Sequence, residues 1–196
     1  MARPLEFDRE TALEESMRIF WRYGYASTSI QRLSKQMCLH PGSLYGAFKS
    51  KRHLFIEALE LYFQRSSQAI REALQEADSP LEGIRRFFYH LLDQIEDERA
   101  IKGCLMINTA TELAEEAGDE ALARRLDEMF RSHEKQFEQA LITAQANGEL
   151  AKDKDPAALA RYLLVGVRGL RIYGKARPSR AELEGVVDNL LAVLRC

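Results

Sequence analysis

Residues 27–54 have the sequence STSIQRLSKQMCLHPGSLYGAFKSKRHL, and this stretch decides the fold of the N-terminal part of the chain. Thr28 and Gln31 match the S/T-x-x-E/Q pattern of a capping box, which predicts the start of a short helix. Pro41 predicts a second short helix, because its missing N–H is harmless in a first helical turn. Apolar residues fall at helical spacing in both segments: Ile30, Leu33 and Met37, then Leu44, Tyr45 and Phe48. Two short helices separated by a turn predict a helix-turn-helix.

The charge of the chain is distributed unevenly around this segment. Lys+Arg 28 against Asp+Glu 30 make a net charge of −2, yet residues 1–55 carry +4 and the remainder −6. Residues 16–56 contain no acid but seven Lys/Arg and two His. A carboxylate here would repel a nucleic-acid backbone, so the asymmetry favours a phosphate-facing surface over a chance solvated face.

The composition predicts an all-α protein. Leu, Ala and Glu supply 71 of 196 residues, whereas Ile, Val and Thr together supply 20. Capping residues, glycines and prolines are typical helix start and stop signals, and they divide the chain into about nine helical stretches. Besides the two short helices, these stretches are 8–23, 50–78, 81–97, 104–114, 119–147, 156–173 and 179–194.

Several function classes lack their signatures. There is no glycine-rich phosphate loop, HExxH or GxSxG, and the four histidines at 40, 53, 90 and 133 are scattered, so we expect no enzyme, metal site or cofactor. Acids crowd residues 6–15, where a secretory leader would not tolerate them. The apolar run 162–167 is far too short to span a membrane. The three cysteines have no CxxC spacing. We therefore expect a cytoplasmic protein.

The helix-turn-helix segment resembles the DNA-binding signature of TetR-type one-component repressors. The matching pattern is Thr28-Ser29-Ile30, Leu33-Ser34 and Gly42-x-Leu44-Tyr45-x-x-Phe48-x-x-Lys51-x-x-Leu54. The resemblance implies a three-helix DNA-binding domain at residues 1–50. A long helix would join it to an α-helical effector-binding and dimerisation domain at residues 51–196. The expected protein is a repressor that binds a palindromic operator as a dimer and is released by a small effector.

The resemblance also assigns roles within the segment. Thr28, Ser29, Tyr45 and Lys51 would hold phosphates, while His40, Pro41 and Ser43 would contact bases. Gly42 would allow close approach to DNA, and Lys49 completes the candidate set. Two positions depart from the family pattern: Cys38 stands where the turn usually has Gly, and Ala47 where a His is common.

The last two predicted helices are candidates for a four-helix dimer interface, and the alternative is that the same residues fill the core of one subunit. Their apolar positions at helical spacing are Leu159, Tyr162, Leu163, Gly166, Val167 and Leu170, then Leu183, Val186, Val187, Leu190, Leu191 and Leu194.

Candidate effector-binding residues are spread over the C-terminal part, and core packing is the alternative for each. Cys104, Asn108 and Thr111 share one helix face. Aromatic residues and a histidine that would wall a pocket are Phe88, Phe130, His133, Phe137 and Tyr162. Arg168 interrupts an apolar helix, so it would pair with an acidic ligand, with Glu112 or with Asp127.

Two other functions stay open from the sequence. Residues 102–105, Lys-Gly-Cys-Leu, are similar to a segment of repressors that sense electrophiles or oxidants through a cysteine, and Lys102 would lower the pKa of the Cys104 thiol. The alternative from another class is a helical adaptor that binds no DNA.

Overall fold

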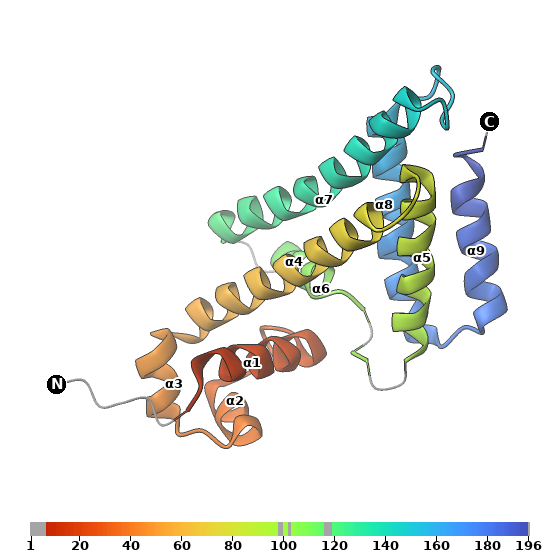
Figure 1. Ribbon diagram of the computed structural model, residues 1–196. Coiled ribbons are helices and arrows are strands. Elements are labelled where there is room, and N and C mark those ends of the chain that lie inside the picture. Colours follow the sequence, from red (N-terminus) through yellow and green to blue (C-terminus); the bar gives the residue numbers. More distant parts are fainter. Residues whose placement is uncertain (1–6, 98–99, 102, 116–118, 196) are drawn as a thin grey trace. The chain divides into compact units, whose positions relative to one another are not determined.

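The computed structural model describes residues 7–97, 100–101, 103–115 and 119–195 (Figure 1). Within these ranges the secondary structure is helical and contains no strand, as the composition predicts. The helices are α1 (Arg9–Tyr23), α2 (Ile30–Met37), α3 (Pro41–Phe48), α4 (Lys51–Gln75), α5 (Pro80–Glu96), α6 (Leu105–Glu115), α7 (Glu120–Ala146), α8 (Pro156–Tyr173), a 3₁₀ turn (Gly174–Ala176) and α9 (Arg180–Ala192).

Local hydrogen bonds set most helix boundaries where the sequence places them. The Asp119 carboxylate accepts from the Leu122 N–H at the start of α7, and Asp155 does the same for Ala157 at α8. Ser179 and Glu182 form a complete capping box before α9. These bonds join residues two or three apart, which is why sequence patterns predict them.

The predicted capping box at α2 is wrong in register. Ser29, and not Thr28, is the N-cap, and its Oγ accepts from the Arg32 N–H at 3.1 Å. Thr28 is fully buried, and its hydroxyl donates to the Gly24 carbonyl at 2.7 Å. Because its hydroxyl is engaged in the preceding turn, the next hydroxyl residue caps the helix.

The chain forms two compact units. Unit 1 comprises residues 1–65 and 105–124, and unit 2 comprises residues 66–104 and 125–196. Helices α4 and α7 each continue from one unit into the other. Unit 1 therefore extends beyond residue 50 and includes α6.

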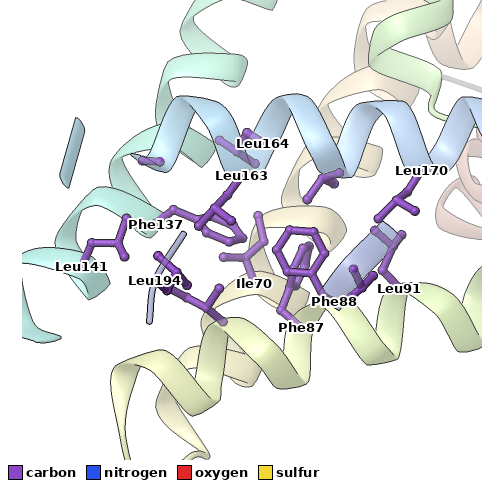
Figure 2. Packing of buried hydrophobic residues seen from close by; sticks show 14 of the residues in the cluster. Ile70, Phe87, Phe88, Leu91, Phe137, Leu141, Leu163, Leu164, Leu170 and Leu194 are labelled. Atoms are coloured by element: carbon purple, nitrogen blue, oxygen red, sulfur yellow. The ribbon is translucent and has the colours of Figure 1, made fainter. Parts of the chain in front are cut away.

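Unit 2 has a continuous apolar core built by α5, α7, α8, α9 and the last part of α4 (Figure 2). Phe87 lies edge-on to Phe88 and to Phe137, with ring centroids 6.0 and 5.3 Å apart. Each large side chain buried in this way contributes about 1.5–3 kcal/mol to stability. At Gly166 a Cβ would come within 2.6 Å of the Leu190 side chain, so this glycine permits the close approach of α8 and α9.

Half of the positions expected in the dimer interface lie in the core of unit 2. Six of the twelve expected positions are buried inside unit 2, namely Leu163, Val167, Leu170, Leu183, Val187 and Leu194. These six residues pack in the core of unit 2, which is the alternative that the sequence leaves open for them. Tyr162 and Val186 of the expected interface are exposed, and with Val165, Ile172 and Tyr173 they form an apolar stripe on α8 and α9.

No helix in the described ranges has both the length and the apolar character that crossing a membrane requires.

Candidate nucleic-acid interface

The helix-turn-helix of unit 1 is held by a small aromatic and aliphatic core. Helix α2 packs against both α1 and α3. Leu33 of α2 and Leu44 of α3 are buried almost completely, as is Phe20 of α1. Phe20 lies edge-on to Phe55 of α4 at 5.0 Å between ring centroids. Helix α3 is thus supported from behind, which leaves its opposite side to solvent.

The solvent side of α3 carries most of the residues expected to meet DNA. His40 caps the helix, and its Nδ1 accepts from the Gly42 N–H at 3.2 Å. Gly42, Tyr45 and Lys49 are exposed, Tyr45 to 50%. Pro41 and Ser43 are partly exposed. These side chains include donors for phosphate oxygens and short groups that suit close approach to base edges.

Three of the predicted phosphate-binding residues also have structural tasks. Thr28 is buried, so its side chain does not reach the surface of this structure. Ser29 is exposed and caps α2. The Lys51 ammonium donates to the Tyr25 carbonyl at 3.0 Å and lies 4.0 Å from the centre of the Tyr25 ring.

The turn between α2 and α3 uses a left-handed residue that is not glycine. Cys38 has φ +54° and ψ +35°, and it is exposed at the C-terminus of α2. The family pattern of Gly at this position thus reflects a real backbone requirement, which Cys38 meets at a cost of about 1–2 kcal/mol.

Sequence reasoning missed the contribution of α6 to unit 1. The Glu112 carboxylate accepts from the N–H groups of Tyr25 at 2.9 Å and Ala26 at 3.1 Å, in the turn between α1 and α2. Arg52 makes two hydrogen bonds to the Asp119 carboxylate, at 2.8 and 2.9 Å. These partners are 67–87 residues apart in the chain, so no local pattern indicates them.

Two expected effector residues also lie in α6 within unit 1. Asn108 Nδ2 is 3.4 Å from the Trp21 carbonyl, to which it donates. Thr111 is exposed, and its hydroxyl donates to the Ile107 carbonyl one turn earlier.

Within unit 2 the other effector candidates separate into three groups. Phe88 and Phe137 are fully buried in the core. This agrees with core packing, the alternative to effector binding for these residues. Tyr162 is 42% exposed and belongs to the apolar stripe of α8. Phe130, His133 and Arg168 come together, with the Arg168 guanidinium 4.3 Å from the centre of the Phe130 ring.

His133 is buried beside two serine hydroxyls. Its Nε2 lies 3.2 Å from Ser66 Oγ and 3.0 Å from Ser67 Oγ. Burial lowers its pKa to about 4, helped by the positive charges of Arg168 and Arg171. The ring is therefore neutral near pH 7 and acts as a hydrogen-bonding group.

Cys104 is buried, at 8% exposure. This burial disfavours the electrophile-sensing alternative, because a reactive thiol has to be accessible. Lys102, the residue expected to activate it, lies outside the described residues. In the part of the chain that the structure describes, no three His, Cys, Asp or Glu residues gather as metal ligands would.

Fold and site together define a helix-turn-helix DNA-binding protein with a second, all-helical unit. Comparison with known proteins leads to the same class. Residues 12–58 match the sequence model described as "Bacterial regulatory proteins, tetR family", and residues 80–190 match "Tetracyclin repressor-like, C-terminal domain". The chain belongs to the TetR family of transcriptional regulators, a class without enzymatic activity.

Two relatives match almost the whole chain. The uncharacterised HTH-type transcriptional regulator YezE of Bacillus subtilis (strain 168) is 33% identical over 195 residues, covering 99% of this chain and 100% of YezE. The HTH-type transcriptional repressor ComR of Escherichia coli (strain K12) is 28% identical over 190 residues, covering 96% and 90%.

A solved structure shows the same fold on DNA. It is a cysteine mutant of the TetR family transcriptional regulator CifR, complexed with 26-bp double-strand operator DNA. It is 32% identical in sequence to this chain and superposes with a TM-score of 0.89, covering 98% of this chain and 100% of that one.

Proposed function

We propose that the protein is a dimeric repressor that binds a palindromic operator through α3 of each subunit and is released by a small effector held in unit 2. The observation that carries the proposal is the exposed side of α3, within residues 16–56 that contain no acid. A surface without carboxylates can approach two phosphate backbones closely, and DNA binding then gains from the release of counterions. The operator complex of CifR supports this reading of the fold.

The proposal divides the exposed residues between two tasks. Phosphate contacts position the helix without selecting a sequence, and they are made by Ser29, Tyr45, Lys49 and Lys51. His40, Pro41 and Ser43, at the N-terminus of α3, lie where a recognition helix enters the major groove and contact base edges. Gly42 lets the backbone come close, because nothing projects from it. Thr28 contributes by fixing the preceding turn.

Dimerisation is assigned to the exposed apolar stripe of α8 and α9. Val165 is 63% exposed and Ile172 52%, which is unusual for large aliphatic side chains. Tyr162, Tyr173 and Val186 continue the same stripe. Two copies of one face, related by a two-fold axis, would cover it and would match the symmetry of a palindromic operator. Since operator DNA in bacteria is cytoplasmic, the proposal places the protein there.

The first test is the dependence of DNA binding on salt. A regulator that contacts several phosphates should lose affinity steeply as salt rises, with a logarithmic slope of about −0.9 per phosphate contacted. Lys49→Ala should weaken binding to all duplexes alike and reduce the magnitude of the slope by about 1. Lys152→Ala, which removes an exposed lysine of unit 2, is the matched control and should change neither.

The second test is sequence preference. Duplexes selected from a random pool by the full-length protein should contain a palindrome, and Ser43→Ala or His40→Ala should change the selected bases. A flat salt response with no selected sequence would instead favour the helical adaptor.

A further inference from the structure

Arg168 is a half-buried cation to which no acid among the described residues is hydrogen-bonded. It lies on α8 among core-facing leucines and valines, and burial lowers its pKa. No hydrogen bond or ion pair joins its guanidinium to another residue of the described ranges. An unpaired charge in a partly desolvated place is costly, so its retention in the middle of α8 requires an explanation.

The internal partners that the sequence suggests are engaged elsewhere. Asp127 binds Arg131 on the next turn of α7 at 2.8 Å. The Glu112 carboxylate binds backbone N–H groups in unit 1. Glu134, an acid whose charge acts on Arg168, is hydrogen-bonded to Arg161 at 2.7 Å.

The guanidinium is nevertheless held in a defined orientation. Its carbon lies 4.3 Å from the centre of the Phe130 ring, which fixes one face of the group by a cation–π contact. A ring interacts with the face of a guanidinium, so the N–H donors at its edge stay available. An edge of this kind matches the two oxygens of a carboxylate with two parallel hydrogen bonds.

The groups around Arg168 are suited to one negative charge. His133 is neutral near pH 7, and Arg171, whose guanidinium donates to Gln94 Oε1, adds positive potential. Buried Cys104 is near enough to act electrostatically on Arg168, and like Glu134 it favours the charged guanidinium. With Phe130 these residues surround a guanidinium that has no hydrogen-bonded partner among the described residues.

We propose that the effector of this regulator is a small monocarboxylate with an apolar body, and that Arg168 binds its carboxylate group. This inference rests on the proposed function, since it names the chemical class of the effector. In this inference Arg168 binds the ligand and does not stabilise the unbound protein.

The test compares acids with their uncharged amides. Calorimetric titration of the full-length protein uses benzoate, phenylacetate and hexanoate, each against benzamide, phenylacetamide and hexanamide. At least one acid should bind about tenfold or more tightly than its amide, as expected for a charge-assisted hydrogen-bonded pair. Arg168→Gln should abolish this preference. Arg131→Gln, which removes an exposed arginine of α7, should retain it.

Stability separates a ligand-binding role from a structural one. In the absence of ligand Arg168→Gln should melt at the same temperature as the parent protein or higher, because an unpaired charge is removed. Saturating acid should raise the melting temperature of the parent and not of the variant. If Arg168→Gln fails to fold, Arg168→Lys decides, since it keeps the charge but loses the fork and should bind the acid about tenfold more weakly.

Three results would overturn the inference: no acid preferred over its amide, a preference that survives in Arg168→Gln, or full affinity in Arg168→Lys. The titrations contain no DNA. They can therefore fail while salt-dependent DNA binding holds, and DNA binding can fail while the preference for acids holds.

Discussion

Cys38 ends α2 in a backbone conformation that residues with a Cβ seldom adopt. Its φ of +54° lies in the left-handed region, where glycine has no steric penalty. We expect Cys38→Gly to raise the free energy of unfolding by about 1 kcal/mol, measured by urea denaturation. The matched control is Lys35→Gly at an exposed position of helix α2, which should lower it by a similar amount. Equal destabilisation by both changes would contradict strain at Cys38.

His133 should make the stability of the protein depend on pH. Its pKa is about 4 in the folded protein and near 6.5 when unfolded, so the unfolded chain binds the extra proton between these values. Stability is full above about pH 6.5 and falls by up to about 3 kcal/mol as the pH approaches 4. We expect His133→Gln to flatten this part of the profile of unfolding free energy against pH.

An exposed histidine provides the control for this profile. His53→Gln, which removes an exposed histidine at the start of α4 and keeps His133, is the matched control. The same steep loss in His133→Gln as in the parent would show that other groups cause it.

At the scale of elements, the Glu112 side chain is one of the contacts that join α6 to the DNA-binding helices. Glu112 binds two backbone N–H groups of the turn that precedes α2. Glu112→Ala removes both bonds to a charged acceptor and should lower the free energy of unfolding by about 1–2 kcal/mol. DNA affinity should fall as well, because the turn loses its support.

Glu120→Ala is the control for Glu112→Ala, because it removes an exposed acid, at the start of α7. It should cost less than about 0.5 kcal/mol, as exposed ion pairs of this kind do. A Glu112 variant with the stability and DNA affinity of the parent would mean that the contact does not support the turn.

For the whole molecule, the oligomeric state depends on the exposed stripe of α8 and α9. Val165→Arg places a charge where the proposal buries an apolar surface, so the dimer should dissociate and sedimentation should show a monomer at micromolar protein. Operator affinity should fall with it, because two linked DNA-binding units become independent. Ala123→Arg, at an exposed position of α7, should remain dimeric. A dimeric Val165→Arg protein would locate the interface elsewhere.

Much of the fold is predictable because its signals are local. Caps such as Ser179 with Glu182 act over three residues, and the composition favours helices over strands, so most helix boundaries follow from the sequence. The acid-free segment and the spacing from Thr28 to Leu54 likewise identify the DNA-binding element. The candidate site is less predictable: Asn108 and Thr111 fall in unit 1, and Phe88 in the core.

Only the tertiary structure decided which face of each helix is buried and which distant residues contact one another. Sequence periodicity marks Leu163 and Tyr162 alike as apolar, but only packing against α5 and α7 buries the first and leaves the second exposed. The roles of Glu112 and Arg168 are likewise not predictable from the sequence. Each role depends on contacts with residues that are tens of positions away in the chain. By itself the sequence determined an all-helical chain with a helix-turn-helix, since those features rest on contacts within a few residues. The assignment of each side chain to core, surface or ligand needed the folded chain, which brings remote residues together.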